Sequence, residues 1–229
     1  IFPRSEWDKK LNLSNWAELT NRGNQLLRSS SFHEKYRKIL LTVSKHINLN
    51  DFYYQAYPTF RIQLPDTKVE PFHRDDLSSG HGKNIINFWI PLTEVNQNNC
   101  LWMIDEKDST LLLERFKSEY LTCNSFDSIA RDKAKPVLMK NNEMLCFSNK
   151  TLHGSVINNS KNVRVSIDFR CLPIKEDPGT KILDVDVQKT KDQNLVLGRF
   201  GYFDYYHNYH SGYYLLTNHQ NRKNQINPN

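Results

Sequence analysis

The sequence has 229 residues, enough for one domain with a substantial core, and its 31 Lys and Arg against 25 Asp and Glu give a net charge of +6. The two signs are interspersed, so this mild basic excess suits an anionic small molecule as well as nucleic acid. The longest apolar runs, at 39–41 and 111–113, are too short to cross a bilayer, and the opening IFPRSEWDKK lacks the apolar core of a signal peptide. Composition therefore excludes a membrane-spanning protein, and we expect a soluble, cytoplasmic one without a membrane partner.

The first part of the chain predicts two helices, between Asn15 and Ile47, because its apolar residues recur at helical spacing. Short strand-like segments bounded by Asn, Asp, Gly and Pro follow, and they lie at 56–65, 84–92, 100–105, 137–149, 152–157 and 163–169. One further helix, roughly from Ser109 to Leu121, interrupts them. Helices followed by about eight strands without βαβ alternation indicate a mainly β fold, an antiparallel barrel or sandwich with the N-terminal helices packed on one outer face.

These patterns predict a single domain over residues 1–229, with a helical annex at 1–50, a strand core at 56–172 and a C-terminal extension at 173–229. From Leu195 onward the extension is rich in tyrosine, phenylalanine and histidine. Such a segment either folds back as a lid or partner surface or packs as a structured C-terminal segment, and we favour packing. The final NRKNQINPN has the composition of a flexible end.

The stretch PFHRDDLSSGHG, at 71–82, concentrates two histidines, two aspartates and two glycines. If the segment from Phe72 to Asp76 is a strand that ends in a loop, His73 and Asp75 point to the same face, because side chains two apart on a strand do so. His153, in another strand-like run that is followed by a turn, is the best candidate for a third ligand. The sequence therefore predicts that these three side chains converge on one metal ion.

Two imidazoles and one carboxylate leave positions open on an octahedral ion, which is the arrangement that non-heme Fe(II) oxygenases use. A closed zinc site would need four ligands, usually with thiolates, and the four cysteines lie far from these residues without a CxxC pair. Asp76 and His81 compete for the metal, although the glycine-flanked loop around His81 is better suited to closing over a substrate. The residues therefore predict an open iron site rather than a structural zinc site.

The segment after His153 indicates a polar surface that faces inward. We interpret Asn158 to Lys161 as a hairpin turn that puts His153 opposite Ser166. The polar side chains on that face are then Arg164, Ser166, Asp168 and Arg170, and the opposite face is apolar. A polar inner row and an apolar outer row fit a barrel that holds an anionic ligand beneath covering helices. Arg164 could bind a carboxylate with the Ser166 hydroxyl beside it, while its rival Arg170 should lie at the barrel rim.

Together these residues resemble the Fe(II)- and 2-oxoglutarate-dependent dioxygenases with a double-stranded β-helix, or jelly-roll, core. The resemblance rests on HxD at His73 to Asp75, the distal His153, and Arg164 eleven residues further on, with Ser166 in an RxS arrangement. It covers about half of the chain, from Tyr57 to Leu172. The segments YPTFRIQLPD, NFWIPLTEVNQNNCLWM and LHGSVINNSKNVRVSIDFR resemble the phytanoyl-CoA-dioxygenase-like branch and, within it, bacterial oxygenases of carbohydrate or streptomycin-type biosynthetic clusters.

The resemblance implies Fe(II) at His73, Asp75 and His153, with 2-oxoglutarate bound to the iron through its keto-acid end and to Arg164 through its far carboxylate. Oxygen (O2) is the second cosubstrate, 2-oxoglutarate is decarboxylated to succinate, and an unactivated C–H bond is hydroxylated. Asp75 is present where related halogenases have a small residue, which disfavours halogenation but leaves desaturation or ring closure open. The implied substrate is a small polar metabolite derived from carbohydrate or amino acid, such as a sugar or nucleotide sugar.

Several other side chains are candidates for the substrate pocket. Arg61 and Gln63 lie two apart on the first core strand, and Asn87 and Trp89 do so on the strand after the metal loop, so each pair shares a face. His81 and Arg170 are further candidates, from the glycine-flanked loop and the barrel rim. The alternative interpretation of the two strand pairs is an ordinary half-exposed strand.

Two other functions stay open. A cupin-type metal-dependent isomerase without oxygen chemistry could use the same ligands, but it has no need of an Arg and Ser pair after the last histidine. A non-enzymatic nucleic-acid-binding protein would use the aromatic tail and the basic balance, but the basic residues do not cluster with the aromatic ones. We rank this function last and expect no nucleic-acid partner. These patterns do not determine the prime substrate, the product stereochemistry or the oligomeric state.

Overall fold

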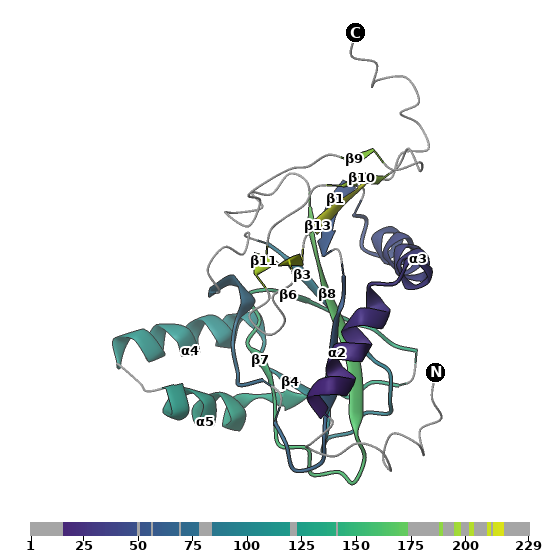
Figure 1. The fold of residues 1–229 in the computed structure, drawn as a ribbon. Helices are drawn as coiled ribbons and strands as arrows, with labels where there is room; N and C mark the ends of the chain where they lie inside the picture. Colours follow the sequence, from purple (N-terminus) through teal and green to yellow (C-terminus); the bar gives the residue numbers. More distant parts are fainter. Residues whose placement is uncertain are drawn as a thin grey trace.

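The computed structural model describes residues 16–49, 51–55, 57–68, 70–77, 84–119, 123–140 and 142–173, together with short strands between 188 and 217 (Figure 1). The helices are α2 (Trp16–Leu27), α3 (Ser30–His46), the 3-10 turn η1 (Asp75–Leu77), α4 (Glu106–Ser118) and α5 (Cys123–Lys133). The strands are β1 (Asp51–Gln55), β2 (Thr59–Gln63), β3 (Ile86–Pro91), β4 (Leu101–Met103), β5 (Lys135–Pro136), β6 (Leu145–Ser148), β7 (His153–Ser155), β8 (Arg164–Pro173), β9 (Gln188–Lys189), β10 (Leu195–Leu197), β11 (Tyr202–Phe203), β12 (His210–Ser211) and β13 (Tyr213–Thr217). The fold is a mixture of helices and antiparallel sheets.

The larger sheet is built around β8, a strand of ten residues. One edge of β8 pairs with β2 and then with β1, while the other edge pairs with β3, which continues to β6. Beyond β1 the sheet extends through β13 and β10 to β9. Because β8 has hydrogen-bonded neighbours on both edges, its side chains alternate strictly between the two faces of the sheet.

The smaller sheet has the order β5-β4-β7, and an isolated antiparallel bridge between His73 and His153 adds the metal-loop segment beside β7. The predicted hairpin from His153 into β8 is wrong, because β7 pairs with β4 whereas β8 pairs with strands of the larger sheet. The intervening segment instead carries the chain from one sheet to the other. The Asn158 side chain holds this turn by donating from Nδ2 to the carbonyl of Asn162 at 2.8 Å.

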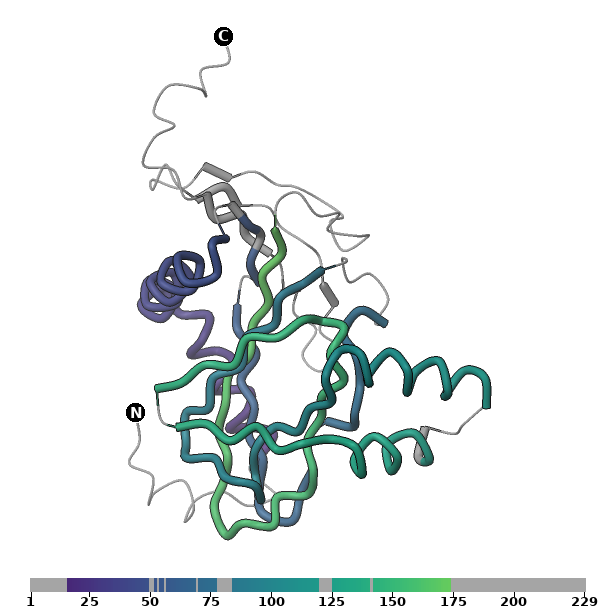
Figure 2. The backbone as a smooth tube through the Cα atoms, turned by 180° about the vertical axis from the view of Figure 1, so that it is seen from behind, coloured from purple at the N-terminus to yellow at the C-terminus, as the bar shows by residue number. Residues whose placement is uncertain are grey.

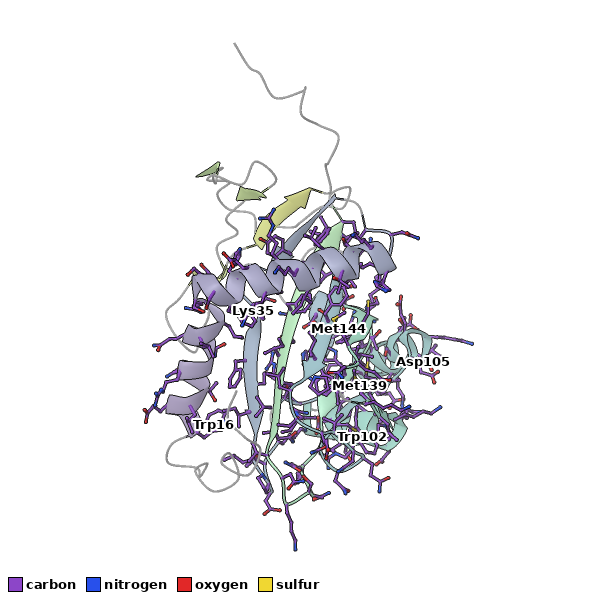
Figure 3. All side chains as sticks on the ribbon, turned by 90° about the vertical axis from the view of Figure 1, so that its right-hand side faces the viewer. Trp16, Lys35, Trp102, Asp105, Met139 and Met144 are labelled. Carbon is purple, nitrogen blue, oxygen red and sulfur yellow. The ribbon has the colours of Figure 1, made fainter. Side chains whose placement is uncertain are left out.

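The helix α3 packs on the outer face of the larger sheet through side chains at helical spacing. Tyr36, Leu40 and Val43 form one buried cluster with residues of β1, β3 and β8. Ser29 caps the helix, because its hydroxyl accepts a hydrogen bond from the N–H of Phe32 at 3.3 Å. Figure 3 shows α3 lying across the strands.

The helix α2 packs against β2 and the start of β8. Trp16, labelled in Figure 3, donates from Nε1 to the carbonyl of Ile62 at 3.1 Å, and Leu27 joins the buried cluster of these strands. Gly23 lets the helix lie close to the sheet, since an added Cβ would overlap the ring of Phe60. Both helices fall in the segment for which the sequence predicts two.

The helices α4 and α5 lie between β4 and β5 in the chain and project from the side of the strands opposite α3 (Figure 1 and Figure 2). The prediction of a single helix from Ser109 to Leu121 is therefore wrong in number and in bounds. The sequence of α5, CNSFDSIARDK, has few apolar residues, and its Phe126 and Ala130 pack in one buried cluster with residues of α4, which supports the helix. None of the described helices is both long and apolar enough to cross a membrane.

Candidate metal centre

Backbone pairing brings two histidines side by side. The N–H of His73 donates to the carbonyl of His153 at 2.9 Å, and the N–H of His153 donates to the carbonyl of His73 at 3.0 Å. Their ring centroids lie 4.4 Å apart. Gly154 permits this approach, because an added Cβ there would fall 2.9 Å from the backbone N and Cα of Phe72. The pairing aligns the first and third predicted ligands before any metal binds.

Asp75 reaches the histidines through a turn. The predicted strand from Phe72 to Asp76 is wrong in this part, because Asp75 begins the 3-10 turn η1. The turn still directs the carboxylate towards His73, with Oδ1 lying 3.7 Å from Nε2 of that ring. His73 and Asp75 therefore converge as predicted, but a turn brings them together and not the alternation of a strand.

The three side chains form one ligand group. One donor atom from each of His73, Asp75 and His153 lies within 4.8 Å of the other two. Nδ1 of His73 lies 2.8 Å from the carbonyl of Pro71, and Nδ1 of His153 lies 3.0 Å from the carbonyl of Thr151. A carbonyl at this distance accepts the Nδ1 proton, which leaves each Nε2 free to bind a metal.

The imidazole of His153 is in the protonation state that a ligand requires. Burial, followed by the nearby His73, lowers the pKa of His153 to about 4. The ring is therefore neutral at pH 7, and a neutral imidazole is the form that binds a metal. The donor set of two imidazoles and one carboxylate fits a divalent cation with open coordination positions.

Both oxygens of the Asp75 carboxylate are held from the larger sheet. Asn87 donates from Nδ2 to Oδ2 at 2.7 Å, and Arg170 donates from Nη2 to Oδ1 at 3.2 Å. Asn87 and Arg170 are cross-strand partners on β3 and β8, so the sheet delivers both side chains to the same place. Burial by itself would raise the pKa of Asp75, but Arg170, followed by the two histidines, holds it well below its usual range. The ligand is therefore an anion at neutral pH.

The ligand group faces a cavity that is open to solvent and has walls from both sheets. The lining residues are Arg61, Glu70, His73, Asp75, Asn87, Phe88, Trp89, Leu101, Phe147, His153, Gly154, Ser155, Arg164, Asp168, Phe169 and Arg170. Three arginines and three acidic residues are among them. The cavity therefore presents charged groups of both signs within a lining that is otherwise mainly apolar.

Arg164 is a buried guanidinium on the cavity wall. It is 2% exposed, its Nη1 donates to the carbonyl of Asn99 at 3.2 Å, and its Nε has no hydrogen-bond partner among the described residues. Its carbon Cζ lies 5.6 Å from the ring centroid of Trp89. Burial, followed by Arg61, lowers the pKa of Arg164 to about 10, so the side chain stays charged at pH 7. A buried cation with an unused donor favours the binding of an anion.

Ser166 lies two residues further along β8, on the same face as Arg164. It is fully buried, and within the part of the chain that the structure describes its hydroxyl oxygen has no hydrogen-bond partner. Ser166 is not among the described residues that line the cavity, but it lies next to Arg164 on the same face of β8. An unused hydroxyl at this place can donate to the same anion.

The structure separates Arg61 from its predicted partner Gln63. Arg61 lines the cavity, where its Nε donates to Asp168 and its Nη1 donates to Glu70 at 2.6 Å. Gln63 does not line it, because its Nε2 donates to the carbonyls of Thr67 at 2.9 Å and Val156 at 2.7 Å. Gln63 therefore connects two loops, although both residues lie on β2.

The two competing ligands stay apart from the metal group. Asp76 is bound by Arg74, whose Nε donates to Oδ1 at 2.8 Å, so its carboxylate is occupied. His81 lies outside the described residues. Arg170 differs from its predicted rim position, since it contacts the metal ligand Asp75 directly.

Sequence reasoning missed Glu70 and Phe147. The carboxylate of Glu70 lines the cavity, and the ring centroid of Phe147 lies 4.8 Å from that of His153. Glu70 comes three residues before His73, and this proximity was a usable signal. Phe147 reaches the site only because β6 pairs with β3, which no local pattern indicates.

The geometry groups three potential metal ligands beside a buried arginine, in a fold of antiparallel sheets. A family model described as phytanoyl-CoA dioxygenase (PhyH) matches residues 6–166, well over half of the chain. The chain therefore belongs to the phytanoyl-CoA dioxygenase family, a family of Fe(II)- and 2-oxoglutarate-dependent oxygenases. This bears out the resemblance drawn from the sequence.

Individual relatives are more distant. The streptomycin biosynthesis protein StrG of Streptomyces griseus is 33% identical over 123 residues, which are 53% of this chain and 47% of StrG. The chain thus spans about half the length of this curated relative. Among solved structures, AviO1 from Streptomyces viridochromogenes Tue57 is 15% identical with a TM-score of 0.40, over 68% of this chain and 62% of AviO1. HygX from Streptomyces hygroscopicus, with nickel, 2-oxoglutarate and hygromycin B bound, is 12% identical with a TM-score of 0.45, over 65% of this chain and 68% of HygX.

Proposed function

We propose that this protein is an Fe(II)- and 2-oxoglutarate-dependent oxygenase that hydroxylates an unactivated C–H bond of a small polar metabolite. The observation that carries the proposal is that the three-ligand group and the buried Arg164, with its unused Nε donor, face one cavity. A cupin-type isomerase would need the three ligands, but it gives no reason to bury a guanidinium without a carboxylate partner.

Each residue then has a definite task. His73, Asp75 and His153 would hold Fe(II) through three positions and leave the others open. The bound iron would supply oxygen activation, coupled to the decarboxylation of 2-oxoglutarate to succinate. Arg164 would bind the far carboxylate of 2-oxoglutarate in the fork geometry of a guanidinium, with the Ser166 hydroxyl as an additional donor.

Trp89 would keep the Arg164 guanidinium oriented. The ring lies beside the cation at 5.6 Å, on a strand that pairs directly with β8. An aromatic ring stabilises a guanidinium without neutralising it, so the positive charge remains available to an anion. A carboxylate in the place of Trp89 would compete with 2-oxoglutarate for the same donors.

The rest of the cavity wall supports a polar substrate. Arg61 holds the carboxylates of Asp168 and Glu70 on the wall, where they can accept hydrogen bonds from hydroxyl or amino groups. The similarity to StrG, a streptomycin biosynthesis protein, supports a role in biosynthesis. We include sugars and nucleotide sugars among the proposed substrates, together with amino-acid derivatives.

We further propose that the two sheets form a jelly-roll core. Strand order supports this: β2, β3, β6 and β8 belong to the larger sheet, whereas β4, β5, β7 and the His73 segment belong to the smaller one. The chain thus crosses repeatedly between two facing sheets, and the cavity has walls from both. Such a core buries the polar inner face of β8 and leaves its apolar outer face to the helices.

The decisive experiment is an anaerobic titration of the metal-free protein with Fe(II) and then with 2-oxoglutarate, followed by visible absorption. We expect a weak charge-transfer band that forms only with both additions and disappears when oxygen is admitted with release of succinate. Iron binding without this band would contradict the assignment of Arg164 and favour a cupin-type metal enzyme. Absence of iron binding would contradict the metal centre itself.

A further inference from the structure

We propose that the helical pair α4 and α5 positions the two histidine ligands, with Asp127 and Ser109 as the positioning residues. The inference rests on the proposed metal site at His73 and His153. The two helices are an insertion between β4 and β5, and they would hold the two histidines in place. Asp127 and Ser109 are far from the histidines in the sequence, so sequence position does not indicate this role.

Each histidine directly follows a residue whose backbone N–H is bound by a side chain of the helical pair. The N–H of Phe72 donates to Oδ1 of Asp127 on α5 at 2.9 Å. The N–H of Leu152 donates to Oγ of Ser109 on α4 at 2.9 Å. Thus α5 binds the residue before His73, and α4 binds the residue before His153 in the same way.

These two N–H groups have no place in the pairing of the histidine segments. His73 and His153 exchange both of their own backbone hydrogen bonds, and N–H groups alternate sides along an extended chain. The N–H groups of Phe72 and Leu152 therefore point away from the partner segment. Asp127 and Ser109 accept donors that would otherwise be buried without a partner.

The side chains of the same two residues enter the apolar core of the helical pair. Phe72 is 4% exposed and Leu152 is fully buried. Their cluster also contains Ile104, Leu112, Leu113, Phe126, Ala130 and Ala134. Each histidine segment is thus held at two points, by a hydrogen bond and by packing, and a shift of either helix would move the residue next to a ligand.

The carboxylate of Asp127 divides its two oxygens between two tasks. Oδ2 accepts from Nζ of Lys68 at 2.6 Å and from Nη2 of Arg131 at 3.0 Å, whereas Oδ1 accepts from the Phe72 N–H. Charge pairing therefore uses one oxygen and backbone positioning uses the other. Because the tasks are separate, substitutions can remove one and keep the other.

The test is a titration of the metal-free full chain with Co(II), read from the intensity and position of the ligand-field absorption bands. Asp127→Ala removes both tasks, whereas Asp127→Asn keeps an oxygen that accepts the Phe72 N–H. Lys68→Gln and Arg131→Gln are matched controls that remove only a charge partner. Ser109→Ala tests the second helix in the same way.

We expect Asp127→Ala and Ser109→Ala to weaken Co(II) binding about tenfold and to change the bands, as loss of a supporting contact does at other metal sites. Asp127→Asn, Lys68→Gln and Arg131→Gln should bind Co(II) like the wild type. Wild-type affinity and bands in Asp127→Ala would overturn the inference, and so would equal losses in Asp127→Ala and Lys68→Gln, since charge would then be the cause.

Thermal unfolding followed by circular dichroism completes the test. Loss of cooperative unfolding in Asp127→Ala would also overturn the inference, because Asp127 would then support the core as a whole. Failure of the wild type to bind Co(II) would contradict the proposed function and the inference resting on it. The wild-type titration alone therefore separates a failure of the metal site from a failure of the positioning residues.

Discussion

Single atoms set the geometry of this site. Gly154 has no Cβ, and the backbone of Phe72 occupies the space where one would be. Among the described residues, Arg164 and Ser166 each keep a buried donor without a partner, whereas the donor Nε2 of Gln63, on the same strand as Arg61, binds two backbone carbonyls. At this scale, a hydrogen-bond donor that is still free to bind an anion, rather than the residue type, distinguishes a proposed binding residue from a structural one.

Gly154→Ala should damage the metal centre. The new methyl group would meet the Phe72 backbone at 2.9 Å, and backbone cannot rotate away as a side chain does. We expect a loss of about 1–3 kcal/mol in the free energy of unfolding, as for other overpacked sites, together with weaker Co(II) binding. Chemical denaturation and Co(II) titration measure the two effects, with the exposed Asn159→Ala as the control. Unchanged values for Gly154→Ala would show that the two segments can separate freely.

Arg164→Gln should weaken 2-oxoglutarate binding by about 10- to 100-fold, the range for losing a charge-assisted hydrogen bond in a buried site. Arg164→Lys should lie between Gln and the wild type, because it keeps the charge but not the fork. Isothermal titration of the Co(II)-loaded protein with 2-oxoglutarate measures the effect, and Co(II) affinity itself should not change. Wild-type 2-oxoglutarate affinity in Arg164→Gln would contradict the proposed cosubstrate position.

At the scale of elements, β8 separates a charged environment from an apolar one. Arg164, Asp168 and Arg170 line the cavity, whereas Val165 and Ile167 pack beside α2. The inserted helices on the other side of the molecule hold the smaller sheet. Their attachment depends partly on charge, through the contact of α5 with the segment before the metal ligands.

The charge on Asp127 should make this attachment dependent on pH. Burial by itself would raise the pKa of Asp127, but Lys68, the Phe72 N–H and Arg131 lower it below the ordinary value of 3.8. A lowered folded-state pKa means that the carboxylate stabilises the fold above the unfolded-state pKa, and that this stabilisation is lost as the pH falls through the folded-state pKa.

The wild type should therefore exceed Asp127→Asn in unfolding free energy by up to about 1 kcal/mol at pH 7, as expected for a partly exposed ion pair. The difference should shrink once the pH falls below about 4. Urea denaturation at a series of pH values measures it, and Asp132→Asn, an exposed carboxylate on the same helix, is the control. A difference that grows towards low pH would contradict the assignment.

At the scale of the whole molecule, the site lies where two sheets face one another. The ligands come from β7 and the loop beside it, while Asn87 and Arg170 reach Asp75 from the larger sheet. A metal ion bound to Asp75 would therefore be coupled to both sheets at once. Binding at such a place should stabilise the entire fold rather than one loop.

Co(II) at about 100 times its dissociation constant should raise the melting temperature by about 5–10 °C, because binding to the folded state alone contributes about 2.7 kcal/mol. Differential scanning fluorimetry with and without Co(II) measures the shift. His153→Ala should show no shift, since one of the three ligands is gone. An equal shift in His153→Ala would place the stabilising ion elsewhere.

Local pattern was sufficient for some of these features. The spacing of apolar residues placed two helices before residue 48, and the HxD stretch with its distal histidine contained all three ligands that the structure brings together. The inner face of β8 was also correctly inferred, although from a hairpin that does not exist. The alternation of side chains along a strand is a local property. The assignment of side chains to the two faces of β8 therefore does not depend on which strand pairs with it.

The sequence by itself determined which functional groups the candidate site contains, namely two imidazoles, a carboxylate and a downstream arginine. Residue types are part of the covalent structure, so they do not depend on folding. Only the tertiary structure decided that Asp75 arrives through a turn, that Arg170 supports the ligand, and that Asp127 and Ser109 hold the histidine segments. These contacts join residues far apart in the chain. They form only when the two sheets and the inserted helices pack, and no local period encodes that packing.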